Sequence, residues 1–583
     1  MIQLLFSVVL AVLLSGGGRK TGSTPSSSGL DSSGVSGELR RAGSGARVSI
    51  SPGATIQDAV NANPAGTTFV LQSGVFRMQS VVPKVGDTFE GRRAILNGSR
   101  QLTSFTRSGI YWVADSQTQH GTANGKCLRA YAGCQYPEDL FFNNIPLQRV
   151  EALEQVATGK WYFDYSAAKI YFVDNPRGKT VEIGITTHAF SGSASNVTIK
   201  GLTIEKYAAP AQDGAISCYG MTNVCLGTGW TIESNEIRLN HGAAVRLASN
   251  QVIQSNYIHH NGQEGLTGSG FNILVEDNEI AYNNTLGFDF GWEAGGTKFS
   301  NTTNLVVQGN YVHDNRGPGL SLDYQTYNWL IQGNRTGGNY VAGILDELGY
   351  DGTARYNIIE NDGSYPGKAS PSMWYGCGIQ ISASQNAQVY GNAVIGNSNG
   401  ICAVSNSRGS GNRGAFLVQN LSIHDNVIVQ GFGSGAGAVA DGGEYLNVYS
   451  SSWNNRWASN TYKLSNSAGN FYIWEEGSNY VGMDASHWQS FGQDTAGTWI
   501  SSTDSGFPSA KFAAARRVRT VASTQVWSLP TTTSALVMIE VIGAQGTVTQ
   551  VAGPIRTDGV WWWSVKYDDG TLGWCEEKYL QTF

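Results

Sequence analysis

Residues 272–347 read NILVEDNEIAYNNTLGFDFGWEAGGTKFSNTTNLVVQGNYVHDNRGPGLSLDYQTYNWLIQGNRTGGNYVAGILDE, and this stretch decides the fold. Three times a short apolar run leads to an Asn, and a Gly nine residues later opens the next apolar run. The three pairs are Asn278 with Gly287, Asn310 with Gly319, and Asn334 with Gly343. Self-similarity on this scale indicates stacked structural units. Alternation of apolar and polar residues inside each unit predicts coils of short strands.

The same pattern continues on both sides of this stretch. Its turn residues are Gly201, Asn235, Asn256, Asn278, Asn310, Asn334, Asn357, Asn392 and Asn426. Stacked Asn side chains can hydrogen-bond to one another along a fibre-like axis. We therefore predict one axial column of Asn256, Asn278, Asn310 and Asn334, and a second column of Gly265, Gly287, Gly319 and Gly343. Longer steps between turns indicate inserted loops, which often line the binding face of a solenoid.

The rest of the chain divides by composition. Residues 1–16 are apolar and end in small residues, as in a secretory signal peptide, and residues 17–45 form a flexible linker rich in Gly and Ser. Residues 46–513 are predicted to form a parallel β-helix, interrupted at about 101–190 by a β-rich insertion. Residues 516–583 form a separate unit of short strands. The fold class is therefore all-β, and we expect a secreted or cell-envelope protein that is a monomer.

Two short amphipathic segments mark the ends of the solenoid. SPGATIQDAVNA places Ile56, Ala59 and Val60 on one helical face, and MDASHWQSFGQD predicts a second short helix. A solenoid must cover its terminal coils, and short helices can do so. In the insertion, WYFDY and KIYFV predict a hairpin. Trp161, Tyr162 and Tyr165 in that hairpin suit core packing more than sugar stacking.

Composition and charge limit the partners. Gly contributes 74 of 583 residues, and charged residues amount to 14 %, well below the usual ~25 %. This balance is typical of many tight turns between short strands. The net charge of −6 offers no broad basic surface, which argues against a nucleic-acid partner.

Seven cysteines permit three local disulfides. Cys127 and Cys134 are seven residues apart, as are Cys218 and Cys225, while Cys377 and Cys402 fall near the same point of successive coils; Cys575 is left over. An exported protein would allow these disulfides. Reduced, buried cysteines are the alternative.

The beginning of the predicted solenoid carries a family resemblance. VSISPGATIQDAVNANPAGTTFVLQSGVF, followed by KVGDTFEGRRAILNGSRQLTSF, resembles the start of secreted right-handed parallel β-helix proteins of the pectate-lyase-like superfamily. The phrases EAGGTK, GLSLD and GILDE resemble those of carbohydrate-active members of that superfamily. The resemblance implies an extracellular polysaccharide as substrate. The signature phrases of pectate lyases, polygalacturonases and alginate epimerases are missing, so no named activity transfers residue by residue.

The C-terminal unit resembles a bacterial SH3-like barrel. The matching elements are Gly546-Thr547-Val548, Gly553-Pro554, Trp562-Trp563-Ser564-Val565 and Gly573-Trp574. Such modules commonly bind peptidoglycan or other wall polymers, so the resemblance implies a cell-wall polymer as a second partner.

Acidic residues follow the coil glycines at matching positions. Asp323 is four residues past Gly319, and Glu347 is four residues past Gly343, so both should point outward on neighbouring coils ~4.8 Å apart at the backbone. Asp289 should lie roughly 8 Å from Asp323. Retaining glycosidases need ~5–5.5 Å between their carboxyl groups and inverting ones ~6.5–9.5 Å. We expect a glycoside hydrolase using Asp323 and Glu347, assisted by Asp289 or Glu293.

Three alternatives compete with this hypothesis. A polysaccharide lyase would use Lys298 or His313 as base, with Arg316 or Ca²⁺ neutralising a uronate carboxylate. A non-catalytic adhesin would only bind glycans. The acids could also be a solvated face clamped by Lys298 and Arg316, or a Ca²⁺ site. A hydrolase requires no cofactor. If the two acids are catalytic, Asp323→Asn and Glu347→Gln should each abolish turnover without lowering the melting temperature.

Aromatic residues crowd the same region and suit contact with sugar rings. The candidates are Trp292, Tyr324, Tyr327, Trp374 and Tyr375, of which the last two lie in a long insertion. Asp346 is an exception to the pattern, because alternation turns it inward. Either a bulge shifts the register there or Asp346 is buried with a partner.

Overall fold

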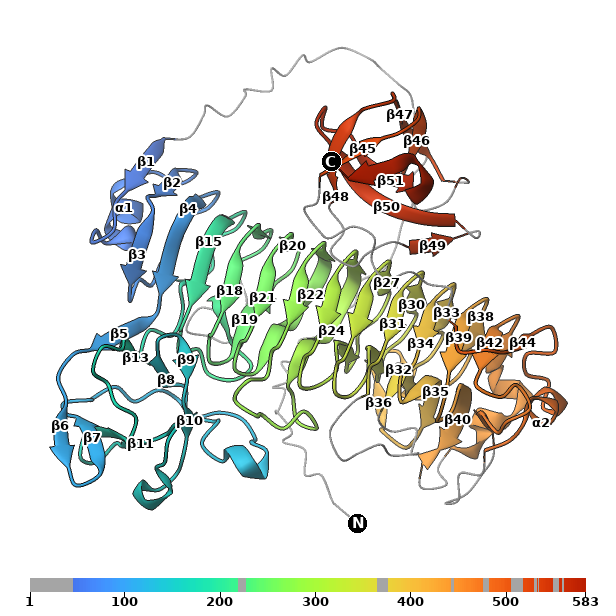
Figure 1. Cartoon of the computed structure of the whole chain (residues 1–583), viewed down its shortest axis with the longest axis horizontal. Helices are drawn as coiled ribbons and strands as arrows, with labels where there is room; N and C mark the ends of the chain where they lie inside the picture. The colour runs from blue at the N-terminus through green and yellow to red at the C-terminus, as the bar shows by residue number, and fades with distance from the viewer. Residues whose placement is uncertain are drawn as a thin grey trace, which may run out of the picture. The chain divides into compact units, whose positions relative to one another are not determined.

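A computed structural model describes residues 46–218, 227–363, 376–441, 445–474, 482–504, 517–528, 532, 534–548, 555–557 and 560–582. The signal and linker segments predicted for residues 1–45 lie outside the described residues. From β1 to β44 the chain winds into a long stack of parallel coils, as predicted, and Figure 1 shows successive coils side by side along the horizontal axis. Each complete coil contributes one strand to each of three parallel ladders.

The first and second ladders meet at the Asn turn of each coil. The first contains β1 (Arg47–Ile50), β2 (Thr68–Leu71), the first part of β4 (Thr88–Asn97) and of β15 (Thr198–Glu205), β17 (Thr231–Glu233), β20 (Val252–Gln254), the second part of β22 (Glu264–Glu276) and of β24 (Gly295–Gln308), β27 (Leu330–Gln332), β30 (Thr353–Arg355), β33 (Gln388–Tyr390), β38 (Ser422–His424) and β41 (Arg456–Ala458). The second contains β3 (Gly74–Arg77), the ends of β4 and β15, β18 (Glu236–Arg238), β21 (Tyr257–His259), β23 (Glu279–Ala281), β25 (Tyr311–His313), β28 (Arg335–Gly337), β31 (Ile358–Glu360), β34 (Ala393–Ile395), β39 (Val427–Gln430), β42 (Thr461–Leu464) and β44 (Thr498–Ser501).

The third ladder carries the sequence-predicted acids. It contains β14 (Phe190–Ser191), β16 (Gly214–Ser217), β19 (Ala243–Leu247), the first parts of β22 and β24, β26 (Leu320–Asp323), β29 (Ile344–Glu347), β32 (Cys377–Ser382), β35 (Asn399–Ser405), β40 (Ala436–Ala440) and β43 (Tyr472–Ile473). A small hairpin of β36 (Ser410–Gly411) and β37 (Gly414–Ala415) follows β35.

The predicted Asn column is confirmed. The side chains of Asn256, Asn278, Asn310 and Asn334 are buried and bond to one another at 2.9–3.0 Å from nitrogen to oxygen. The full column is Asn235, Asn256, Asn278, Asn310, Asn334, Asn357, Asn392, Asn426, Asn460 and Asp494. A second column lies five residues further along each coil and contains Asn240, Asn261, Asn283, Asn315, Asn339, Asp362 and Asn397.

The predicted Gly column needs one correction. Its members are Gly265, Gly296, Gly319 and Gly343, and Gly287 is not among them. A Cβ on Gly265 would lie 2.7 Å from the carbonyl oxygen of Gly296, and a Cβ on Gly296 would lie 2.5 Å from that of Gly319. The column requires glycine because neighbouring coils approach too closely for a side chain. Gly287 instead belongs to a loop inserted before β24, where a Cβ would collide with Tyr131.

The core lies inside the coils and is closed by a helix at each end. Ile237, Ile258, Ile280 and Val312 stack on successive coils and are fully buried. The predicted terminal helices are α1 (Ile56–Ala62) and α2 (Ala485–Ser490). The 3-10 turns in the described residues are η1 (Arg129–Tyr131), η2 (Leu153–Gln155), η4 (Leu446–Tyr449), η5 (Ser451–Trp453) and η6 (Glu577–Tyr579). No helix in these described segments has the length and hydropathy of a membrane span.

The N-terminal insertion forms two small sheets. One contains β6 (Thr106–Ser108), β7 (Tyr111–Ala114), β10 (Gln148–Arg149), β11 (Lys160–Asp164) and β12 (Lys169–Phe172); the other contains β5 (Ser99–Leu102), β8 (Leu140–Phe142), β9 (Ile145–Pro146) and β13 (Val181–Gly184). The predicted hairpin is β11 with β12, and Trp161 is fully buried in its core. A buried ion pair between Lys206 of the β-helix and Glu182 of β13 anchors the insertion.

The C-terminal unit is an antiparallel sheet. Its strands are β45 (Arg517–Thr520), β46 (Thr524–Trp527), β47 (Leu536–Glu540), β48 (Gln545–Val548), β49 (Ile555–Thr557), β50 (Val560–Tyr567), β51 (Leu572–Glu576) and β52 (Leu580–Thr582). Val518, Trp563 and Val565 form its core. The SH3-like assignment of this unit stays a prediction.

Disulfides join Cys127 to Cys134 and Cys377 to Cys402, as the spacing allowed. Cys218 is also disulfide-bonded, whereas Cys225 lies outside the described residues. Cys575 is free and buried. Disulfides of this kind persist in oxidising compartments, which agrees with a secreted or cell-envelope location.

Candidate active site

Lys298 lies at the centre of a cluster of carboxyl groups on the outer face of the third ladder. It is placed there by pairing with Thr267 on the preceding coil. Its Nζ lies 2.8 Å from Oδ2 of Asp323, and the two side chains are only 14 % and 19 % exposed. Burial alone would lower the pKa of Lys298, but Asp323, Glu293 and Glu347 together raise it well above its usual range. Lys298 therefore keeps its proton at neutral pH.

Asp323 and Glu347 lie on adjacent coils, as their spacing predicted. Leu322 pairs with Asp346, and the two acids are the next residues on these neighbouring strands. Their backbones are therefore about 4.8 Å apart. Both side chains remain partly exposed, at 19 % and 21 %.

Each of these two acids has a cationic partner. Lys298 pairs with Asp323, and Arg408, from the segment before β36, forms an ion pair with Glu347. Arg316, which was expected to act as a clamp, is exposed at the corner after β25; burial, His259, Arg238 and the charge of Arg316 lower the pKa of His260. Removing Asp323 would leave buried Lys298 without its counter-charge, which is destabilising. The expectation that an amide at Asp323 leaves the melting temperature unchanged is therefore revised.

Glu264, which sequence reasoning missed, lies beside the same cluster. It is 1 % exposed, and neither carboxyl oxygen has a hydrogen-bond partner among the described residues. Burial and the nearby charge of Glu293 raise the pKa of Glu264 to about 8, and Lys298 and Thr267 oppose this rise in part. A carboxyl group that keeps its proton at neutral pH is typical of functional sites. The feature of the sequence that could have identified Glu264 as a site residue is its position directly before Gly265.

The loop before β24 brings Glu293 close to Lys298, whereas Asp289 does not lie on a strand as predicted. The side chain of Glu293 accepts a hydrogen bond from Nε2 of Gln212. Asp289 was expected on a strand, two residues past a column glycine, and that placement is wrong because its loop is an insertion. Its Oδ1 caps a turn by accepting from the Gly291 N–H, and its own N–H donates to the carbonyl of Lys126 in the N-terminal insertion. The residue that pairs with Asp323 is Ser300.

Asp346 points into the coil without a bulge. It pairs with Leu322 on one side and Ile381 on the other and is 1 % exposed. Burial raises the pKa of Asp346 to about 8; the Ser384 hydroxyl opposes this rise, and Asp323 and Glu347 add to it. Asp346 is therefore a buried neutral acid beneath the outer pair at neutral pH.

The expected base His313 lies on another ladder. It belongs to β25, where its Nδ1 contacts Asp314 at 2.8 Å and its Nε2 contacts Glu279 at 3.3 Å. Burial lowers the pKa of His313, but the bonds to those two carboxylates outweigh it and raise the pKa above the ordinary value. The structure does not bring His313 together with Asp323.

The predicted aromatic contacts have four different outcomes. Tyr324 is 43 % exposed, directly after Asp323, and its N–H donates to the Asp323 carboxylate at 2.6 Å. Tyr327 lies under the guanidinium of Arg413 at 4.0 Å. Trp292 packs in the apolar cluster around the Cys127–Cys134 disulfide. Trp374 and Tyr375 lie outside the described residues.

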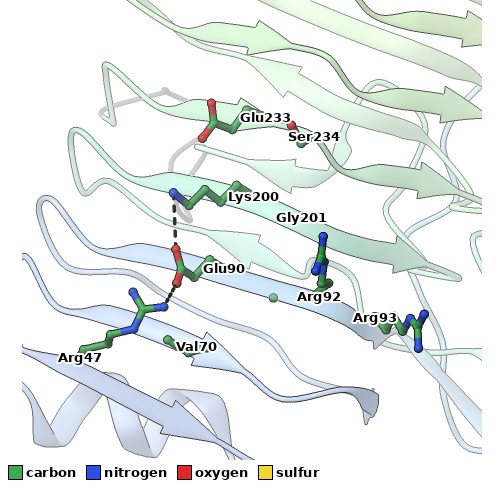
Figure 2. A pocket seen from close by; sticks show the side chains of 10 residues that line it. Arg47, Val70, Glu90, Arg92, Arg93, Lys200, Gly201, Glu233 and Ser234 are labelled. Atoms are coloured by element: carbon green, nitrogen blue, oxygen red, sulfur yellow. Dashed lines mark hydrogen bonds and ion pairs between the residues drawn. The ribbon is translucent and has the colours of Figure 1, made fainter. Parts of the chain in front are cut away.

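A separate pocket of about 490 Å³ lies over the first coils and contains none of the sequence-predicted site residues. Figure 2 shows Arg47 and Lys200 approaching Glu90 from two sides; Nζ of Lys200 lies 3.4 Å from Glu90. Arg92 and Arg93 also line this pocket. In the described part of the chain, no group of three or more His, Cys, Asp or Glu is arranged to hold a metal ion.

Comparison with known proteins supports the fold. The family model described as the right-handed beta helix region matches residues 214–413. Among solved structures, the chain is similar to XylC in complex with xylose, at 15 % identity over 80 % of this chain and 87 % of that chain, with a TM-score of 0.52. A search of curated proteins finds no match.

Two further solved structures are similar at lower scores. One is the A-module of the Azotobacter vinelandii mannuronan C-5 epimerase AlgE6, at 14 % identity over 76 % of this chain and 92 % of that chain, with a TM-score of 0.42. The other is a glycoside hydrolase, at 10 % identity over 68 % and 96 %, with a TM-score of 0.39. The chain thus contains a right-handed β-helix.

Proposed function

We propose that the protein is an extracellular glycoside hydrolase in which Asp323 and Glu347 are the catalytic carboxyl groups. The observation that carries this proposal is the pair itself: two partly exposed acids on adjacent strands, each fixed by a cation. One carboxyl group gives a proton to the glycosidic oxygen as the bond from that oxygen to the anomeric carbon breaks. The other removes a proton from the water that attacks that carbon, or attacks it directly before water does.

The surrounding residues fit this chemistry. Lys298 is held protonated, so its charge can stabilise negative charge that develops near Asp323. Tyr324 offers an exposed ring next to the acids for contact with a sugar. The similarity to XylC, whose structure contains xylose, agrees with a carbohydrate ligand.

The lyase alternative is less well supported. Elimination needs a base that can lose its proton near neutral pH. Lys298 is a poor base because three carboxylates raise its pKa, and His313 lies on a different ladder. An adhesin remains the alternative if no turnover is found. We further propose that the C-terminal unit binds a cell-wall polymer.

Amide variants of the two acids test the hydrolase. Asp323→Asn and Glu347→Gln should each lower turnover by about 10²–10⁴-fold, measured as reducing ends released from a polysaccharide panel. Ser300→Ala is the matched control, because Ser300 pairs with Asp323 but carries no charge. Unsaturated products, seen by ultraviolet absorbance, would instead indicate a lyase.

A double variant separates catalysis from stability. Asp323→Asn should lower the melting temperature by isolating buried Lys298, and adding Lys298→Met should recover part of that loss but no activity. Full activity in Asp323→Asn would end the catalytic assignment.

A further inference from the structure

Each cation next to the two acids is already paired with one of them. Lys298 is paired with Asp323 at 2.8 Å, and Arg408 is paired with Glu347. Glu293 and Glu264 lie close enough to Lys298 to alter its pKa or to have theirs altered by it. The cluster therefore holds four carboxyl groups and two cations.

Two further cations near this face are also paired. Arg246, three coils before Asp323, lies 3.9 Å from Asp213, and Arg413, beside Tyr327, forms an ion pair with Asp351. In register along the third ladder, Thr267 and Ser321 flank Lys298, and the residues that follow Ser321 on the next coils, Leu345 and Gln380, are uncharged. Among the described residues, the cations in contact with Asp323 and Glu347 are paired with these acids, so a carboxylate placed over them would meet like charges.

From this pairing we infer that the sugar ring that lies over Asp323 and Glu347 is uncharged, so the substrate is a neutral glycan at the reacting ring and not a uronate. The inference rests on the proposed function. Hydroxyl groups suit this surface, because they donate to carboxylates and accept from ammonium and guanidinium N–H groups. Lys has three N–H donors and Arg has five, so each retains donors after pairing with one acid.

Charge-matched substrates and one variant test this inference. The full-length protein is assayed on xylan, mannan and β-glucan as neutral polymers and on polygalacturonate and alginate as uronate polymers. Binding to the same polymers is measured by affinity electrophoresis at low salt. We expect turnover of a neutral polymer at least about 100-fold above that of either uronate. Equal or faster turnover of a uronate overturns the inference while leaving a catalytic site in place.

Glu347→Gln provides a readout that needs no turnover. It should be inactive, but it frees Arg408, so its affinity for polygalacturonate should rise about tenfold and fall again with added salt. Strong wild-type binding to polygalacturonate, unchanged in Glu347→Gln, overturns the charge argument. If no polymer is turned over, the proposed function fails. A tenfold gain in the affinity of Glu347→Gln for polygalacturonate would then still support the inference that Glu347 neutralises Arg408 in the wild type. Glu347→Asp, which keeps the charge, is the control and should show no gain.

Discussion

Replacement of one ladder asparagine, Asn278→Ala, should destabilise the β-helix far more than its small change in volume suggests. The Asn278 side chain accepts from the backbone N–H and the Nδ2 of Asn256, both at 2.9 Å. Its own Nδ2 contacts the carbonyls of Ile253 and Glu276 and Oδ1 of Asn310, at 2.8, 2.9 and 3.0 Å. These contacts fix the turn between the first and second ladders to the coils on both sides.

The expected loss follows from these bonds. The Nδ2 group has only two hydrogens, so its three contacts count as two bonds, and with the two accepted bonds the total is about four. At about 1 kcal/mol each, the variant should lose about 4 kcal/mol of unfolding free energy. Part of this loss reflects the Asn256 N–H, which stays buried when its acceptor is removed.

Denaturant unfolding and amide hydrogen exchange measure this effect. The denaturation midpoint should fall, and exchange of the Asn256 amide should accelerate before that of distant coils. Glu276→Ala is the matched control, because Glu276 is two residues away and accepts one outward bond from Gln308. The control should cost less than about 1 kcal/mol. If Asn278→Ala costs no more than Glu276→Ala, the Asn column does not stabilise the coils.

The other predictions concern Asp346, the C-terminal unit and the second ladder. The folded pKa of Asp346 is raised to about 8, so its favourable contribution to the unfolding free energy is present below about pH 4 and is lost as pH rises through 8. Asp346→Asn should therefore flatten the dependence of the melting temperature on pH between pH 5 and 9. A pH dependence equal to that of the wild type would contradict this. Deleting residues 516–583 should leave cooperative unfolding and activity on soluble glycans intact while reducing sedimentation with cell walls, so lost cooperativity would mean that the unit belongs to the core. Asp362 has a pKa raised by burial to about 7, so Asp362→Asn should remove a loss of stability that the wild type shows on going from pH 5 to 8, checked by thermal melts across that range.

Local pattern was enough to predict the coils. The predicted Asn column, the helices α1 and α2 and the β11–β12 hairpin depend on residue spacing within one coil or turn, and their residues lie where the spacing places them. The outward direction of Asp323 and the inward direction of Asp346 also follow from strand alternation, which acts over two residues.

An inserted loop made the predicted register of one coil wrong. The nine-residue step from Asn278 to Gly287 matches the other coils, yet the structure inserts a loop there and uses Gly296 in the column. Sequence periodicity cannot distinguish a column glycine from a turn glycine when both fit the step. Only the close approach of Gly265 and Gly319 to Gly296 decides between them.

The sequence by itself determined that this protein is a solenoid with two outward acids on adjacent coils. The tertiary structure decided which charges face those acids. Arg408 is 61 residues from Glu347 along the chain, and Glu264 is near Glu293 through the loop before β24, where Nε2 of Gln263 donates to the Glu293 carbonyl. Strand alternation is a property of neighbouring residues, whereas charge pairing and burial depend on which coil and loop pack together, and that is set by contacts distant in sequence.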